Sequence, residues 1–282
     1  MSRSGFLKRF WQRCWKSWVT MAALVALVVL VFVTLFGPVI APYDPLKPDY
    51  RNTLSPPSTE HLFGTDQLGR DILSRVLYGA RVSVSIGVFA VLLGLLAGTS
   101  IGLVAGYSGG RIDAFLMRSI DVMLAFPDIL LAIMIISIFG SSVTNIILAL
   151  AVFSVPTFAR VSRSSALSIK NLEYVQAAVS TGGSAFRILA VHILPNSLAP
   201  VVVYGTLRTA TAILGGAALS FLGLGIAPPT AEWGLMVSQG RDVLRSAPFV
   251  MMFPGLAIFV TVLAVNLLGD ALRDVMDPKG QY

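Results

Sequence analysis

Residues 160–196 read RVSRSSALSIKNLEYVQAAVSTGGSAFRILAVHILPN and form a polar interruption between two long blocks of apolar sequence. Its charged side chains are too many for the interior of a bilayer; they are Arg160, Arg163, Lys170, Glu173 and Arg187. The flanking blocks are long enough to hold several membrane-spanning helices. The chain is therefore predicted to be an integral membrane protein with a long polar loop late in its sequence.

The composition points the same way. Of the 282 residues, 55% are hydrophobic and 12% are charged, and the mean hydropathy is +0.79, whereas soluble domains carry about 25% charged residues. The net charge of +7 is expected to reflect loops on the cytoplasmic side, because no basic patch interleaved with aromatic residues predicts a nucleic-acid partner. Cys14 is the only cysteine, and the two histidines, His61 and His192, lie far apart. A disulfide within the chain is excluded, and a histidine-based metal or catalytic cluster is not expected.

Six segments are long and apolar enough to cross a membrane, since a helix needs roughly 20 apolar residues to span a hydrocarbon core of about 30 Å. They are Val19–Ile40, Val82–Ala105, Ser119–Phe139, Val143–Ala159, Leu198–Leu224 and Phe249–Leu272. The first follows a basic start, but its apolar run is too long for a signal peptide and lacks an A-x-A-like site, so it is predicted to be an uncleaved anchor. The predicted fold class is all-α, with six transmembrane helices.

The distribution of Lys and Arg predicts the orientation. With both termini inside, thirteen fall in cytoplasmic segments and seven in external ones, which favours this orientation. Residues 1–18 and 273–282 are then cytoplasmic ends, and residues 41–81 form an external loop. Residues 82–272 form a core that contains the cytoplasmic loop 160–196.

The end of the external loop has the pattern of an amphipathic helix. Asp71 and Arg75 are spaced for an i,i+4 ion pair, and apolar side chains share the opposite face. The pattern predicts a helix that lies on the outer membrane surface. Packing of this helix against the spans is the alternative.

The second predicted span carries small residues at every fourth position: Ala90, Gly94, Gly98, Gly102 and Gly106. Such a stripe lets the backbone of another helix approach closely. The partner helix is expected within this chain, and a second membrane subunit is the alternative.

Two ionisable side chains are predicted at membrane depth. Asp128 and Arg208 lie at similar distances along the third and fifth spans from their cytoplasmic ends, about 15–18 Å at 1.5 Å per residue. They form a candidate intramembrane ion pair, or they border a solute path. Pro127, just before Asp128, predicts a kink.

The polar loop is predicted to contain two short helices. Asn171 is placed to cap the first, and Gly182 and Gly183 are placed to end it. Ser184 is placed to cap the second, Ala185–Leu194, which is predicted to bury a face formed by Phe186, Leu189 and Ile193 and to end at Pro195. These features predict an ordered docking surface for a soluble partner.

This loop resembles the EAA loop of bacterial ABC-importer permeases, through QAAVSTGG (176–183) and HILPN (192–196). In that family the loop forms a coupling helix that inserts into a cleft of the cytoplasmic ATPase. The resemblance implies that the ATPase-coupling residues are Glu173, Tyr174, Gln176, Ala177, Ala178, Gly182 and Pro195. The acidic residue that names the motif is replaced by Gln176, and Glu173, one turn earlier, is a candidate substitute.

Four further stretches resemble the dipeptide/oligopeptide permeases, in particular their second, C-type subunit: residues 61–87, 121–133, 219–236 and 253–278. The resemblance implies a type I importer in the bacterial cytoplasmic membrane. Its partners would be a paralogous permease, two cytoplasmic ATPases and an extracytoplasmic solute-binding protein. The expected cargo is peptides, and nickel or glutathione are the alternatives, since importers of both belong to this family.

The chain has no GxxxxGK[ST] phosphate loop. We therefore expect a transport subunit that is not itself an enzyme and binds no cofactor, with ATP and Mg²⁺ on the ATPase partners. An ion-coupled secondary transporter is the main rival, but such proteins normally show related halves, and no internal repeat relates residues 19–159 to 198–272. A membrane-embedded enzyme or a scaffold is less well supported by these residues.

Overall fold

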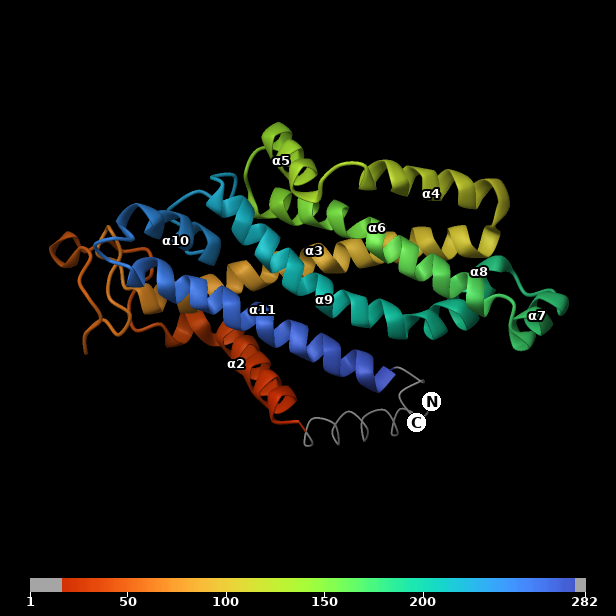
Figure 1. Cartoon of the computed structure of the whole chain (residues 1–282), viewed down its shortest axis with the longest axis horizontal. Coiled ribbons are helices and arrows are strands. Elements are labelled where there is room, and N and C mark those ends of the chain that lie inside the picture. The colour runs from red at the N-terminus through yellow and green to blue at the C-terminus, as the bar shows by residue number, and fades with distance from the viewer. Residues whose placement is uncertain (1–16, 277–282) are drawn as a thin grey trace.

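The computed structural model describes residues 17–276, and over this range the chain is almost entirely helical (Figure 1). The main helices are α2 (Trp18–Ile40), α3 (Ile72–Ser108), α4 (Gly110–Leu124), α5 (Asp128–Phe139), α6 (Val143–Ile169), α7 (Glu173–Ser180), α8 (Ala185–Arg187), α9 (Leu194–Phe221), α10 (Trp233–Gly240) and α11 (Phe249–Met276). The predicted basic start and the last residues of the C-terminal tail lie outside the described range.

Five helical stretches are long and apolar enough to cross a membrane, and a sixth crossing is made if the bent pair α4 and α5 counts as one span. The six predicted spans therefore correspond to α2, α3, α4 with α5, α6, α9 and α11. Figure 1 shows the loop 41–71 and α10 at one end of the bundle and α7 at the other. The positive-inside argument assigns the α7 end to the cytoplasm.

Helix α3 lies at the centre and α2 at the edge. In the most apolar part of α3, 44% of residues are buried, against 6% in α2. Helix α2 packs on α3 and α11 and turns most of its Val, Leu and Phe side chains outward. Such a surface suits contact with lipid.

The predicted surface helix is wrong, because residues 72–81 are the first turns of α3. Asp71 caps this long helix by accepting from the backbone N–H of Ser74 at 2.7 Å. Ile72 and Arg75 are buried, so this end packs against the rest of the protein, as the alternative held. The expected Asp71–Arg75 ion pair is wrong too, since Arg75 pairs instead with Asp66, at 3.4 Å.

The small-residue stripe of α3 packs against α6, which confirms that its partner helix lies within this chain. A Cβ atom added at Gly98 would lie 2.5 Å from the carbonyl oxygen of Val155 and 2.7 Å from the Cβ of Phe158. One added at Gly106 would lie 2.7 Å from the Cβ of Ala166. The two backbones are therefore in direct contact along most of α6.

The third predicted span is broken. Helix α4 ends at Leu124, α5 begins at Asp128, and their axes differ by 86°. Pro127 has no N–H for a helical bond, and its ring disfavours a helical conformation at Phe126. The predicted kink at this proline is confirmed, but a single continuous span over Ser119–Phe139 is wrong.

The predicted break at Pro195 is also wrong. Residues 185–221 form one continuous helical stretch, in which a π-helical segment, Ile188–Ile193, joins α8 to α9. Pro195 stands in the first turn of α9, where a missing N–H is tolerated because the hydrogen-bonding pattern changes there. The fifth span therefore extends directly into the cytoplasmic loop.

We expect Gly98→Ala to reduce the free energy of unfolding by about 1–3 kcal/mol, because the new methyl group would force α3 and α6 apart. Gly255→Ala is the matched control, since a Cβ there meets nothing within 4 Å. It should leave stability unchanged or raise it by up to about 1 kcal/mol. Unfolding of both variants in mixed micelles would measure this, and an equal effect of the two would contradict the close packing.

Candidate coupling surface and membrane cavity

Helix α7 stands at the end of the bundle that is assigned to the cytoplasm (Figure 1). Val175 is its buried residue. Val175 is fully buried in a cluster with five residues: Leu103, Ala166, Ile169, Ile188 and Ile193. These come from the ends of α3 and α6 and from the π-helical segment. Val175 therefore joins α7 to the ends of three long helical stretches.

The turn after α7 is a Schellman motif. The N–H of Gly183 donates to the carbonyl of Ala178 at 3.0 Å, and that of Gly182 donates to Val179 at 3.0 Å. Gly182 has φ +81°, a left-handed conformation that favours glycine. The predicted stop is confirmed, and so is the cap by Ser184, which accepts from the N–H of Arg187 at 3.4 Å. The predicted cap by Asn171 is wrong, since α7 has Leu172 at its N-cap position and no side-chain cap.

Most of the predicted coupling residues share the exposed face of α7. Glu173, Gln176 and Ala177 are exposed and Ala178 is half-buried. Gln176 donates its side-chain N–H to the carbonyl of Lys170 at 2.7 Å, which ties the loop back to the end of α6. The structure places Glu173 and Gln176 on the same exposed side of the helix, one turn apart.

Tyr174 and Pro195 lie where α7 faces the start of α9. The Asn196 side chain donates to the Tyr174 hydroxyl at 3.2 Å, and the Tyr174 ring lies 6.0 Å from that of His192. Phe186 does not belong to a buried face as expected: it is 81% exposed, while Ile188 and Ile193 are buried. Phe186 lies in α8, before the π-helical segment that holds these two buried residues.

Two ion pairs between α4 and α6, which sequence reasoning missed, fix the cytoplasmic side of the broken span. Arg163 binds both carboxylate oxygens of Asp113 at 2.6 Å, and Arg160 binds Asp121 at 2.7 Å. Lys170 adds a bond to the carbonyl of Gly106 at 2.8 Å. Opposite charges in neighbouring loops were the available signal, but sequence spacing alone does not pair them.

Asp113→Asn should lower the free energy of unfolding by about 1–2 kcal/mol, because it weakens a bidentate, partly buried pair. Asp121→Asn is the matched control: its pair is 59% and 61% exposed and should contribute less than about 1 kcal/mol, decreasing with salt. Unfolding of both variants at low and high ionic strength would test the difference. Equal losses would show that burial does not distinguish the two pairs.

Asp128 and Arg208 do not form the predicted ion pair, since no contact within 4 Å joins them in the described part of the chain. Arg208 donates instead to the Thr157 hydroxyl at 2.8 Å and to the carbonyl of Phe153 at 3.3 Å. Its guanidinium lies 4.5 Å from the centre of the Phe153 ring, a cation–π distance. Arg208 is thus held by α6 and not by Asp128.

A cavity of about 250 Å³ lies between α5, α6 and α9 at membrane depth. Among the described residues that form its wall, Asp128 is the one ionisable side chain, and Thr211 adds a hydroxyl. The other lining residues are apolar: Ile129, Ala132, Leu150, Phe153, Leu214, Gly215, Ala218 and Leu219. The cavity therefore combines one carboxylate with a surface suited to aliphatic groups.

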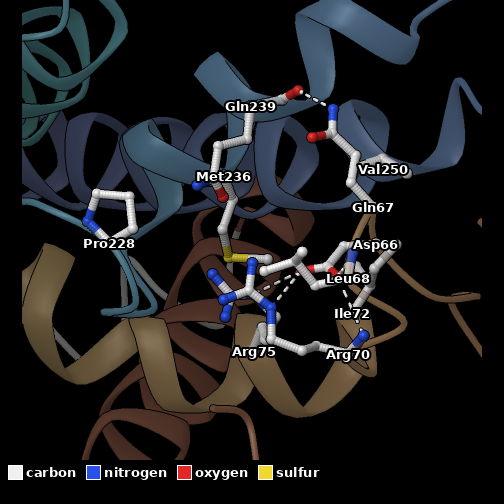
Figure 2. Close-up of a pocket in the computed structure, with 10 residues that line it drawn as sticks. All are labelled: Asp66, Gln67, Leu68, Arg70, Ile72, Arg75, Pro228, Met236, Gln239 and Val250. Carbon is white, nitrogen blue, oxygen red and sulfur yellow. Dashed lines mark hydrogen bonds and ion pairs between the residues drawn. The ribbon is translucent and has the colours of Figure 1, made fainter. Parts of the chain in front are cut away.

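The outer end of the protein holds a second pocket, of about 270 Å³, beside a buried charge cluster (Figure 2). Asp66 accepts from the Nε of Arg70 at 2.7 Å and lies 3.4 Å from the Nε of Arg75. Arg75 also donates to the carbonyl of Pro45 at 2.9 Å. These bonds hold the external loop against the start of α3.

Helix α10 is locked to α3 at the same end by Glu232. Its carboxylate accepts from the N–H groups of Gly234 and Leu235 at 2.8 Å and from the Ser83 hydroxyl at 3.1 Å. The indole N–H of Trp233 donates to the carbonyl of Val76 at 2.9 Å. A buried carboxylate with three donors is well satisfied, so this group is structural.

Comparison with known proteins defines the class. Residues 98–281 match the family described as binding-protein-dependent transport system inner membrane component. Residues 5–57 match the N-terminal TM domain of oligopeptide transport permease C. The chain belongs to this family of ABC-importer permeases and corresponds to the C-type subunit.

Curated relatives cover almost the whole chain. A glutathione transport system permease protein GsiD of Escherichia coli is 49% identical over 271 residues, which are 96% of this chain and 89% of that protein. The protein of that name from Pectobacterium atrosepticum is 45% identical over 273 residues, which are 96% and 91% of the two chains.

Solved structures show the same fold. An inward-facing structure of the MetNI methionine ABC transporter matches with a TM-score of 0.59 at 19% identity, over 71% of this chain and 96% of that one. An amino acid ABC transporter solved with histidines matches with a TM-score of 0.53 at 19% identity, over 71% and 92%. The fold is that of an ABC-importer permease.

The chain is thus a multi-pass protein of the bacterial inner membrane and a transport subunit without enzymatic activity of its own. It holds no cofactor, and ATP acts on the ATPase partners. Permeases of this class work with a second permease, with ATPases and with a binding protein.

Proposed function

We propose that this chain forms, with a paralogous permease, the translocation path of an importer for short peptides. The match of its N-terminal segment to oligopeptide transport permease C carries this proposal. Glutathione is the cargo that the names of the relatives favour, at 45% and 49% identity, and it is itself a small peptide. The structure adds a cavity whose single carboxylate can pair with the free amino group that short peptides, glutathione included, carry.

The proposed coupling element is α7 together with the turn after it. Its exposed side carries Glu173 and Gln176, and its buried side is held by Val175. Two cytoplasmic ATPases would each contact one permease of the pair, this chain through α7. When the ATPases close on ATP, displacement of α7 would move the ends of α3, α6 and α9 together, because the Val175 cluster joins all three. Glu173 would supply the acidic contact that Gln176 lacks.

The cargo is tested by uptake into proteoliposomes that contain both permeases, the ATPases and the binding protein. Dialanine and glutathione are offered separately, with nickel as the comparison. We expect peptide uptake that requires ATP and persists when ion gradients are dissipated. Uptake that follows an ion gradient without ATP would contradict coupling to the ATPases. Uptake of nickel but of neither peptide would show that the cargo is nickel and not peptides.

Gly182→Val should abolish most ATPase binding and uptake while leaving insertion into the membrane normal. A β-branched residue strains a φ of +81°, although no atom lies within 4 Å of the added Cβ. Gly182→Asn is the matched control, because Asn tolerates the left-handed region, and it should retain both activities. Co-purification of the ATPases and uptake report the result, and equal loss in both variants would remove the turn geometry as the cause.

A further inference from the structure

Asp128 is an exposed carboxylate beside the middle turns of α6 and α9, because it lines one cavity with Phe153 and Thr211. It stands at the first residue of α5, directly after the break in the span, and is exposed. It makes no hydrogen bond or ion pair with any residue in the range 17–276. A charged group near the bilayer centre costs roughly 2.5–3.5 kcal/mol on insertion scales. The open side of Asp128 therefore faces water or a ligand and not acyl chains.

The protein keeps the nearest positive charge away from this carboxylate. Arg208 is held by the Thr157 hydroxyl and the Phe153 ring, and it does not line the cavity that contains Asp128. Phe153 stands between the two sites, since one of its faces receives the guanidinium and the side chain also lines the cavity. The carboxylate is left free to bind an external cation.

The shape and chemistry of the cavity indicate which cation. At about 250 Å³ it lies just below the usual size of small-molecule pockets, about 300–1,000 Å³. It therefore accommodates part of a small peptide. Its walls are aliphatic or aromatic apart from Asp128 and Thr211, which disfavours a hydrated metal ion. A primary ammonium next to an apolar side chain satisfies both features.

We infer that the cavity between α5, α6 and α9 binds the free amino group of the transported peptide, with Asp128 as its counter-ion. The inference rests on the proposed peptide cargo and adds a specificity residue to it. The α-ammonium of the amino-terminal residue would contact the carboxylate, and the first side chain would lie against Leu150, Leu214 and Leu219. Peptides with a blocked amino terminus would lose this contact.

The test uses the complete transporter in nanodiscs, with Cys14→Ser and Thr211→Cys in this chain, so that one thiol lies in the cavity wall. Its modification by a cationic methanethiosulfonate (trimethylammonium-ethyl) and by an anionic one (sulfonato-ethyl) is followed by mass spectrometry of this chain. The reacting thiolate itself favours a cationic reagent, so the ratio of the cationic to the anionic rate is compared with and without the carboxylate. We expect Asp128→Asn to lower this ratio about tenfold, because the attraction to the carboxylate is lost. Ser246→Cys, on the exposed outer loop, is the control and should not respond to Asp128→Asn.

The ligand is then identified by whether it protects the thiol in the cavity wall from modification. Dialanine and S-methylglutathione should slow modification of the thiol in the cavity wall by about threefold or more, whereas N-acetyl-dialanine should not. A thiol that neither reagent reaches would overturn the inference, because the cavity would then be covered by lipid or by the second permease. A rate ratio that is unchanged in Asp128→Asn, or equal protection by the acetylated peptide, would also overturn it.

Uptake measured in parallel separates the two proposals. If peptides are transported but do not protect the thiol, the amine site is wrong and the proposed function stands. If no peptide is transported, the proposed cargo is wrong. In that case ethylammonium is tested as a protecting ligand. If it slows modification of the thiol in the wild-type background but not in Asp128→Asn, the cavity binds the amino group of another solute. If it does not slow modification, the amine site is wrong.

Discussion

The contact between the backbones of α3 and α6 is the constraint on which the remaining structure depends. Apolar side chains gain little by leaving lipid for a protein interior, so helices in a membrane associate through close packing and polar contacts. The stripe from Gly94 to Gly106 supplies this packing, because carbonyl groups and Cβ atoms of α6 occupy the space where side chains of α3 would stand. Helices α2 and α9 pack against α3 in turn.

Both ends of this helix pair carry parts of the protein that we propose as surfaces for soluble partners. At the cytoplasmic end, Val175 of α7 packs in one buried cluster with Leu103 of α3 and Ala166 of α6. At the outer end, α3 begins at the Asp66 charge cluster and holds α10 through the bond between Ser83 and Glu232. A rigid pair with a partner surface at each end can carry a displacement across the membrane as one body. The break at Pro127 leaves α5 outside this rigid unit, packed mainly on α6.

The sequence predicted the parts of the fold that depend on local chemistry. Apolar length located the spans, and Gly182 and Ser184 marked the turn in the coupling loop because their roles need only neighbouring backbone groups. A helix at the start of α3 was predicted, but its continuation into the second span was missed, because a helix that extends beyond the membrane loses its hydropathy signal there. The cap by Asp71 and the packing around Arg75 are visible only in three dimensions. The effect of Pro195 was misjudged because the π-helical segment that absorbs it has no simple sequence pattern. Matched depth suggested that Asp128 meets Arg208, but depth says nothing about the direction in which each side chain leaves its helix.

The arrangement of charges in the whole protein shows why it matters that Asp128 and Arg208 do not pair. Two carboxylates near the ends of the protein are occupied by arginines: Asp66 by two of them, and Asp113 by two nitrogens of the Arg163 guanidinium. Within the membrane the opposite holds, because Thr157 and Phe153 occupy Arg208 and leave Asp128 without a direct partner among the residues that the structure describes. A direct pair at this depth would have been the simplest way to reduce the cost of burying either charge. Separation of the two keeps a carboxylate available at a cavity, and this is the arrangement that the inferred binding of an amino group requires.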